Sequence, residues 1–130
     1  MISNIAIFGG SGGIGTAFTK QFTFLNPNAT INIFSRQKPK KVLPNVKYHS
    51  INYQDEVSID ESAKIASKDS LIDMVIVATG ILHEGELKPE KSIKDLSLEK
   101  FQRIFEINSI VPILIAKHFL PKMNREKKSI

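Results

Sequence analysis

A glycine-rich turn between an apolar stretch and a helical pattern constrains this chain more than any other feature. The stretch Ile5-Ala6-Ile7-Phe8 is typical of a buried strand, and the apolar pattern that begins near Gly13 predicts a helix. Glycines between the two let the backbone adopt positive φ and approach a ligand closely. The start of a helix presents unpaired N–H groups and the positive end of the helix dipole. The arrangement predicts either an anion-binding turn or a tight turn that binds nothing.

Strand and helix patterns alternate along the rest of the chain. We expect strands at 4–8, 30–34, 46–51 and 71–78, and helices at 13–24, 56–67 and 98–120, the last capped by Ser97. The continuous apolar run within the fourth strand is typical of a strand covered on both faces, and Pro112 should kink or loosen the last helix. Residues 1–130 contain no internal linker, so we expect a single domain. The alternation predicts an α/β fold with a Rossmann-like, doubly wound parallel sheet in strand order 3-2-1-4, ending before a fifth strand.

The composition limits the class of protein. The chain has 130 residues, of which 42% are hydrophobic and 24% are charged, as in an ordinary soluble domain. It has no cysteine, which excludes a disulfide scaffold and a thiolate metal site. The N-terminus does not resemble a signal peptide. No run of apolar residues approaches the length of about 20 residues that is needed to span a bilayer. We therefore expect a cytoplasmic protein without a membrane partner, and the spacing of His49, His83 and His118 predicts no metal site.

The net charge of +5 is concentrated in two clusters, residues 36–41 and 122–128. Neither cluster has interleaved aromatic residues or belongs to a recognisable nucleic-acid-binding module. We expect no nucleic-acid partner, and a solvated loop and a solvated helix end are the simplest interpretation of the two clusters.

The spacing of the glycines is Gly9-x3-Gly13-x-Gly15, which differs from the common dinucleotide pattern G-x-G-x-x-G. It resembles the short-chain dehydrogenase/reductase family, whose motif is T-G-x-x-x-G-[IVL]-G, with Phe8 at the position of the usual Thr. The resemblance implies an oxidoreductase fold that binds a nicotinamide dinucleotide. It implies that the following residues contact this cofactor: Gly9, Gly10, Ser11, Gly12, Gly13, Ile14 and Gly15.

Ser35 and Arg36 follow the second expected strand, where a site that prefers NAD usually offers an Asp or Glu to the ribose. No acidic residue occurs between Gly15 and Asp55. An arginine can pair with a 2′-phosphate through two hydrogen bonds, whereas an acid would repel it. Arg36, helped by Ser35, is therefore predicted to select NADP over NAD. The alternative is a solvated arginine at the end of a strand.

Two further segments match family positions in order. Asn52, followed by Tyr53, stands where the family usually has an Asp beside the adenine, and an Asn can still accept a hydrogen bond there. The end of the fourth strand reads Val77-Ala78-Thr79-Gly80 in place of N-N-A-G, so only the last glycine is identical. This variant, continuing as I-L-H-E-G-E, resembles the C-factor-like subgroup. The resemblance implies cofactor contacts by Asn52, Tyr53, Ala78, Thr79 and Gly80.

Asn108 matches the asparagine that the family places in its long helix. The resemblance implies a catalytic role, in which this residue holds a water molecule of a proton relay. A polar side chain on an apolar helix face needs a partner, because burying an unpaired amide costs about 1–3 kcal/mol. The alternative is that Asn108 bonds the carbonyl freed by Pro112.

The second half of the family pattern, a Ser followed by Tyr-x-x-x-Lys, is absent from these residues. Neither Tyr48 nor Tyr53 has a lysine four positions later. A general acid must protonate the carbonyl oxygen during reduction, so we expect the chain alone to be inactive. It is then the NADP-binding N-terminal half of a reductase, a non-catalytic dinucleotide-binding regulatory protein, or an interaction protein that has lost the ligand.

The fourth strand and the last helix are expected to be exposed, because the residues that would cover them are absent. This exposure predicts a homo-oligomer.

Overall fold

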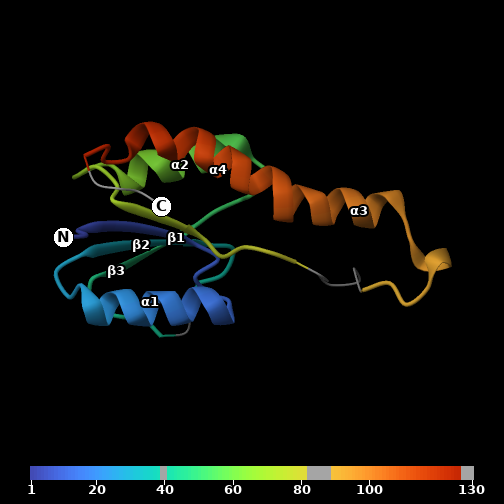
Figure 1. Cartoon of the computed structure of the whole chain (residues 1–130), viewed down its shortest axis with the longest axis horizontal. Helices are drawn as coiled ribbons and strands as arrows, with labels where there is room; N and C mark the ends of the chain where they lie inside the picture. The colour runs from blue at the N-terminus through green and yellow to red at the C-terminus, as the bar shows by residue number, and fades with distance from the viewer. Residues whose placement is uncertain (39–40, 82–88, 127–130) are drawn as a thin grey trace.

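The structure, a computed structural model, describes residues 1–38, 41–81 and 89–126. Within these residues, a sheet of four parallel strands has the order β3-β2-β1-β4. Helix α1 covers one face of the sheet, and helices α2 and α4 cover the other (Figure 1). This arrangement confirms the predicted α/β fold and strand order. The strands are β1 (Asn4–Phe8), β2 (Thr30–Ser35), β3 (Val46–Ser50) and β4 (Met74–Val77).

The two central strands form the core because both of their faces are apolar and covered. Every residue of β1 is buried, and so is every residue of β2 except the first. The isoleucines of both strands pack on the α1 side, together with Val46 of β3. Phe8 and Phe34 pack on the opposite side, where their rings stack at 5.1 Å and both contact Phe119 of α4 edge to face.

The first two helices begin and end close to the predicted residues. Helix α1 (Gly13–Leu25) ends where the Asn26 N–H donates to the Phe22 carbonyl. Helix α2 (Glu56–Ala66) begins after Asp55, whose carboxylate accepts the Val57 N–H at 3.0 Å. A carboxylate at this position also stabilises the positive end of the helix dipole.

A π-helical turn, η2 (Glu106–Ile110), separates helix α3 (Leu98–Phe105) from helix α4 (Val111–Phe119). In this turn the Val111 N–H donates to the Glu106 carbonyl, five residues earlier instead of four. Pro112 lacks the N–H that would donate to the carbonyl four residues before it, so the regular pattern fails here. The predicted loosening of the helix at Pro112 is therefore confirmed. Two short 3-10 turns, η1 (Ile93–Asp95) and η3 (Leu120–Lys122), flank the helical segment.

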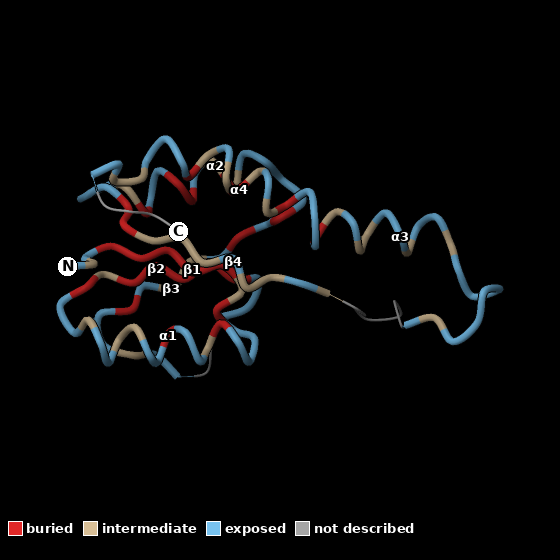
Figure 2. Tube along the Cα trace, in the orientation of Figure 1, coloured by how far each residue is buried: buried red, intermediate tan, exposed pale blue. Residues whose placement is uncertain are grey.

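Helix α3 projects away from the body of the molecule (Figures 1 and 2). None of its residues is buried, and Phe105 is 60% exposed. Within the described residues, the helical segment 98–122 is long and apolar enough to cross a membrane by length and composition alone. The sequence alone predicts no segment of that length. That prediction counts unbroken apolar runs, and polar residues such as Asn108 interrupt the apolar residues of this segment. The core helix of a soluble protein has the same properties, and Ile115 and Phe119 of this segment are buried against the sheet.

Strand β4 is less covered than its sequence predicts. Its residues are half-buried or exposed, with Val77 38% exposed, because within the described residues no strand pairs with the outer edge of β4. Among the described residues, Ile72, two positions before β4, is the one paired on that side. The Ile72 N–H donates to the Lys122 carbonyl at 3.0 Å, and the Asn124 N–H donates to the Ile72 carbonyl at 2.8 Å. The chain after α4 therefore returns alongside β4 in the parallel direction.

A row of polar side chains, buried at Asn4 and Asn32 and half-buried at His49, crosses the sheet on the side of α2. The Asn4 amide donates to the Ala66 carbonyl at 2.8 Å and accepts from the Asn32 amide at 3.4 Å. The Asn32 amide oxygen in turn lies 3.0 Å from His49 Nε2. Because buried polar groups require partners, this row fixes β1, β2 and β3 relative to one another and to the end of α2.

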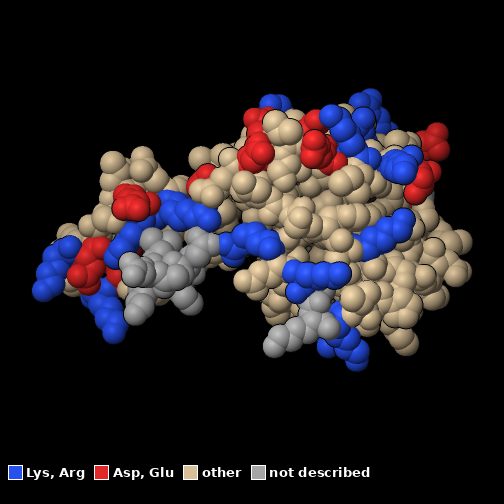
Figure 3. All heavy atoms as spheres, turned by 180° about the vertical axis from the view of Figure 1, so that it is seen from behind, with Lys and Arg blue, Asp and Glu red and all other residues tan. Residues whose placement is uncertain are grey.

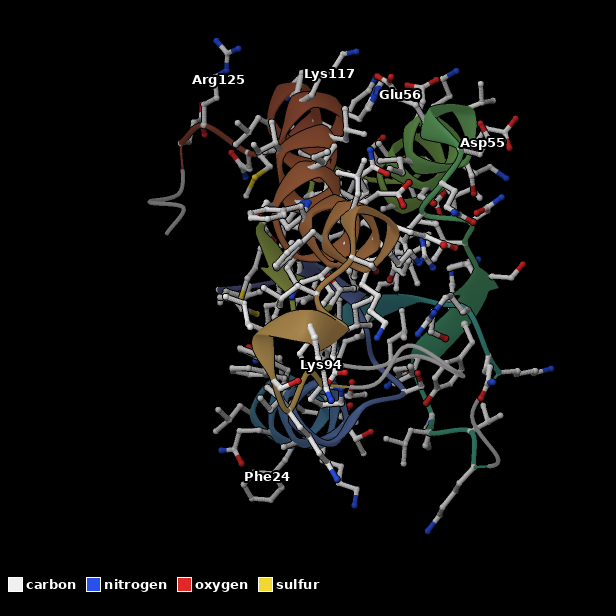
Figure 4. All side chains as sticks on the ribbon, turned by 90° about the vertical axis from the view of Figure 1, so that its right-hand side faces the viewer. Phe24, Asp55, Glu56, Lys94, Lys117 and Arg125 are labelled. Carbon is white, nitrogen blue, oxygen red and sulfur yellow. The ribbon has the colours of Figure 1, made fainter. Side chains whose placement is uncertain are left out.

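Charged side chains link α2 to α4 on the outside of that layer. Glu56 and Lys117 point toward each other and form an ion pair (Figure 4). His118 lies between two carboxylates, with Nε2 2.9 Å from Glu56 and Nδ1 3.2 Å from Asp60. The hydrogen bonds from Lys117 and His118 lower the pKa of Glu56. These exposed pairs orient the two helices more than they stabilise the fold.

Candidate functional site

Three glycines of the turn are required by close packing. Gly9 has a φ of +77°, and a methyl group on it would lie 2.7 Å from the Ala78 carbonyl oxygen. A methyl group on Gly10 would lie 2.3 Å from the Ile33 side chain. On Gly15 it would lie 2.1 Å from the Gly9 carbonyl oxygen. These positions let α1 pack closely against the ends of β1, β2 and β4.

Gly13 differs from these glycines because no atom lies within 4 Å of the position where its Cβ would be. It is the first residue of α1, after Gly12, which has no side chain to cap the helix. The first turn of the helix contains no acidic residue, and the Thr16 N–H is bonded to the Gly12 carbonyl at 2.9 Å. The N–H groups before Thr16 therefore have no acceptor within the helix, which is the geometry of an anion site.

A hollow of about 140 Å³ lies between the glycine turn and the ends of β2, β3 and β4. It brings together most of the predicted cofactor-binding residues, while Gly10, Gly13, Ile14, Gly15 and Asn52 do not line it. Two lining residues, Ile81 and Ile107, are absent from the sequence prediction, because an isolated apolar residue carries no local signal of a site. The lining residues are Gly9, Ser11, Gly12, Ser35, Arg36, Tyr53, Ala78, Thr79, Gly80, Ile81 and Ile107.

Ser35 and Arg36 play different parts at the end of β2. Ser35 is buried, and its hydroxyl donates to the Gln37 carbonyl at 2.6 Å, so it shapes the turn. Arg36 is exposed and lines the hollow. The first 54 residues contain no Asp or Glu and six Lys or Arg residues, Lys20, Arg36, Lys38, Lys40, Lys41 and Lys47. In the view from behind, acidic side chains lie over the α2 and α4 layer and on the projecting part of the molecule (Figure 3).

Asn52 and Tyr53 follow β3, but only Tyr53 lines the hollow. The Asn52 amide oxygen accepts the Gln54 N–H at 3.1 Å and so stabilises the turn that leads to α2. The Tyr53 hydroxyl donates to the Phe34 carbonyl at 3.3 Å, and the same carbonyl accepts the Gly9 N–H at 3.0 Å. Burial raises the pKa of Tyr53 to about 12, despite the opposing effects of the Gly9 backbone and Arg36.

Thr79 lies at the end of β4 and has an unusual hydroxyl. Its Oγ1 is buried and has no hydrogen-bond partner among the described residues. Thr79 lines the hollow together with Ala78 and Gly80, and its backbone N lies close to the Gly9 turn. An unsatisfied buried hydroxyl is uncommon in folded proteins.

Asn108 lies in the π-helical turn and binds the backbone of Ile81 through two hydrogen bonds. Its amide oxygen accepts the Ile81 N–H at 2.8 Å, and its amide nitrogen donates to the Ile81 carbonyl at 2.9 Å. The alternative role at the carbonyl freed by Pro112 is therefore wrong, because that carbonyl belongs to Asn108 itself. The side chain instead holds the segment after β4 against the helix. The role of Asn108 in a proton relay stays a prediction.

The described residues contain no cluster of His, Asp or Glu side chains that could hold a metal ion. His83 lies outside the described residues.

Comparisons with known proteins identify the family and the fold. A sequence model of the short chain dehydrogenase family matches residues 3–130. No curated protein sequence matches the chain. The fold is similar to that of a short chain dehydrogenase family protein from Francisella tularensis subsp. tularensis, with a TM-score of 0.79 and 22% identity, over 99% of this chain and 50% of that chain.

Two other solved structures are similar at lower identity. One is the ligand-free aldohexose dehydrogenase of Thermoplasma acidophilum, with a TM-score of 0.76 and 19% identity, over 94% of this chain and 45% of that one. Another is an NADH-dependent reductase complexed with NAD, with a TM-score of 0.77 and 15% identity, over 92% and 51% of the two chains. The chain thus spans about half the length of these proteins. The family match extends over nearly the whole sequence and includes the glycine turn, so the chain belongs to the short-chain dehydrogenase/reductase family.

Proposed function

We propose that this chain binds NADP(H) and forms the cofactor-binding part of a reductase that interconverts carbonyls and alcohols. The observation that carries the proposal is the uncapped N-terminus of α1 at Gly12 and Gly13, beside a hollow that Arg36 lines. The open space at Gly13 fits a diphosphate close to the backbone N–H groups. When bound, the cofactor supplies the hydride chemistry, and these residues hold and orient it.

The proposed preference for NADP rests on charge. Arg36 follows β2 at the position where an acidic residue would bind the two ribose hydroxyls of NAD. A guanidinium group pairs well with a phosphate, and no acidic residue among the first 54 residues opposes it. The solved NADH-dependent reductase shows that the fold also accepts NAD in another protein. We assign the difference to Arg36, with Ser35 shaping its turn.

Proton transfer is proposed to need residues beyond these 130. The Tyr53 hydroxyl donates a hydrogen bond to a backbone carbonyl, and its pKa is raised to about 12. Burial also raises the pKa of Tyr48, so neither tyrosine is suited to protonate a substrate near neutral pH. These observations equally favour a second candidate function, a non-catalytic dinucleotide-binding protein.

The variant Val77-Ala78-Thr79-Gly80 remains the basis for proposing a C-factor-like subgroup.

We further propose that the protein is cytoplasmic and homo-oligomeric. The support for self-association is the exposed apolar surface of α3 and η2 together with the open edge of β4. The apolar residues of that surface are Leu98, Phe101, Phe105 and Ile110.

Calorimetric titration of the purified protein with NADPH and with NADH tests the cofactor proposal. We expect tighter binding of NADPH. Arg36→Ala should weaken NADPH binding by about 1.5–3 kcal/mol, or roughly 10- to 150-fold, and leave NADH binding nearly unchanged. Arg125→Ala is the matched control, because Arg125 lies on the exposed chain after α4 and points away from the body (Figure 4). Equal binding of the two cofactors by the unmodified protein would contradict the proposed selectivity.

A further inference from the structure

The connection between β2 and β3, residues 36–45, contains no helix among its described residues. A crossover between parallel strands usually holds a helix, and a right-handed crossover places this connection on the same face of the sheet as α1. Within the described residues, α1 is therefore the one helix that covers this face (Figure 1). The outer strand β3 is covered less completely than β1 and β2, and its Tyr48 is only half-buried.

A hollow of about 240 Å³ lies at this place, between α1 and the chain that leads into β3. A cavity of about 150 Å³ holds a benzene molecule, so this hollow has room for one ring with a short side chain. It shares no lining residue with the hollow beside the glycine turn. Its lining residues are Gly10, Thr16, Thr19, Lys20, Lys41, Leu43 and Tyr48.

The inner part of this hollow is apolar. Leu43 and Tyr48 are half-buried and pack against the isoleucines on the α1 side of the sheet. Burial raises the pKa of Tyr48 above its ordinary value of 10.0, against the opposing effect of the Leu43 backbone, so the phenol is uncharged at neutral pH. An aromatic side chain of this kind favours another ring, because aromatic pairs gain more than their buried area alone provides.

The outer part of the hollow is positively charged. Lys20 of α1 and Lys41 of the connection are both exposed, and within the part of the chain that the structure describes neither forms an ion pair. No acidic residue among the first 54 competes with a ligand for these ammonium groups. The Thr19 hydroxyl already donates to the Gly15 carbonyl at 2.8 Å. An anionic group that enters this hollow is therefore attracted to its lysine side.

We infer that this hollow is a second ligand site, which takes a small aromatic acid with one ring and a carboxylate on a short chain. The ring packs against Leu43 and Tyr48, and the carboxylate faces Lys20 and Lys41 at the solvent side. This arrangement matches the apolar and the charged part of such a ligand to the two parts of the hollow. The inference does not rest on the proposed cofactor-binding function, because the two hollows have no residue in common.

Titration of the purified protein with phenylacetate, followed by the backbone amide signals in proton–nitrogen correlation spectra, tests the inference. We expect saturable shifts at the residues that line this hollow, with a dissociation constant on the order of 1 mM for a ligand of this size. Acetate lacks the ring and phenylacetamide lacks the charge, so both should bind more weakly. Cyclohexylacetate keeps the charge but not the aromatic ring, and should bind about 2- to 10-fold more weakly than phenylacetate.

Substitution of the lysines tests the placement of the carboxylate. Lys20→Met and Lys41→Met should each weaken phenylacetate binding by about 2- to 5-fold, as expected for exposed ion pairs, and leave the binding of phenylacetamide unchanged. Lys47→Met is the matched control. Lys47 is exposed on β3 next to Tyr48, but successive side chains of a strand point to opposite faces, and Lys47 does not line this hollow.

Several outcomes would overturn the inference. These are the absence of saturable shifts, equal binding of acetate or of cyclohexylacetate, and an equal loss of affinity in Lys47→Met. Displacement of phenylacetate by NADPH would also overturn it, because the two ligands would then share one site. If phenylacetate binds as expected and NADPH does not bind, only the proposed cofactor function fails.

Discussion

At the scale of single residues, three glycines of the turn are needed by the fold, whereas Gly13 leaves room for a ligand. Gly10 is one of the three, because its Cβ would meet the Ile33 side chain at 2.3 Å. We expect Gly10→Ala to lower the free energy of unfolding by about 1–3 kcal/mol through overpacking. Urea denaturation monitored by circular dichroism measures this loss. Gly13→Ala should cause no comparable loss, since no atom lies within 4 Å of its Cβ position.

Gly13→Ala is instead expected to impair binding. Alanine is favoured over glycine inside a helix by up to about 1 kcal/mol, so the variant should be as stable as the unmodified protein or more so. Its methyl group would occupy the space next to the N–H groups of the first helical turn, where we place the diphosphate. NADPH affinity measured by calorimetry should fall while stability is kept. Unchanged affinity in a stable Gly13→Ala variant would contradict this placement.

The residues of the candidate site differ in how far the sequence could predict them. Arg36 and the glycines carry local signals, namely a charge after a strand and a fixed spacing before a helix. The partner of Asn108 carries no such signal, because Ile81 lies 27 residues away and contributes only its backbone. The unpaired state of the Thr79 hydroxyl is likewise a property of packing. It could not be predicted before the fold was known.

At the scale of elements, the polar row Asn4–Asn32–His49 makes stability depend on pH. Burial, followed by the nearby charge of Lys47, lowers the pKa of His49 from its ordinary value of 6.5. The unfolded chain therefore binds a proton at a higher pH than the folded protein does. The contribution of neutral His49 is complete above pH 6.5 and decreases as the pH falls from there toward the lowered pKa.

Replacing this histidine should remove that part of the pH dependence. We expect His49→Gln to flatten the decrease in unfolding free energy below about pH 6.5, when urea denaturation is compared at several pH values. Above about pH 7.5 the difference between the variant and the unmodified protein should be constant. Parallel curves across the whole range would show that His49 does not contribute to the pH dependence.

The order of the elements could be predicted because each has a clear period and the crossovers are right-handed. The burial of β4 could not, because the apolar run Met74–Val77 is the same whether or not a further strand covers it. The π-helical turn was predictable only as a disturbance at Pro112. Its form depends on which carbonyl accepts the displaced N–H, and here that carbonyl is Glu106.

At the scale of the whole molecule, α3 extends an apolar surface into solvent. Phe105 is 60% exposed on this helix and Leu98 is 73% exposed. We expect the unmodified protein to self-associate at micromolar concentration, and Phe105→Glu to shift it toward the monomer. Sedimentation velocity across a concentration series measures this. A charge placed in a buried apolar contact between copies is strongly unfavourable.

Phe24→Glu is the matched control for this experiment. Phe24 is 81% exposed on α1, at a different part of the molecule from α3 (Figure 4). The substitution adds the same charge without touching the α3 surface, so self-association should persist. A concentration-independent mass of about 14.5 kDa for the unmodified chain would contradict the proposal. Equal dissociation by both substitutions would show an effect of net charge instead.

The carbonyl oxygen of Phe34 has a consequence for how a ligand is recognised. It accepts the Gly9 N–H at 3.0 Å and the Tyr53 hydroxyl at 3.3 Å, so one atom joins the ends of three strands. A ligand that displaces the tyrosine ring also acts on the turn that precedes the helix. We therefore expect the two ends of a bound adenine dinucleotide not to contribute independently to its binding. Binding free energies measured for its separate fragments should not sum to that of the intact molecule, because each fragment reorganises the same shared anchor.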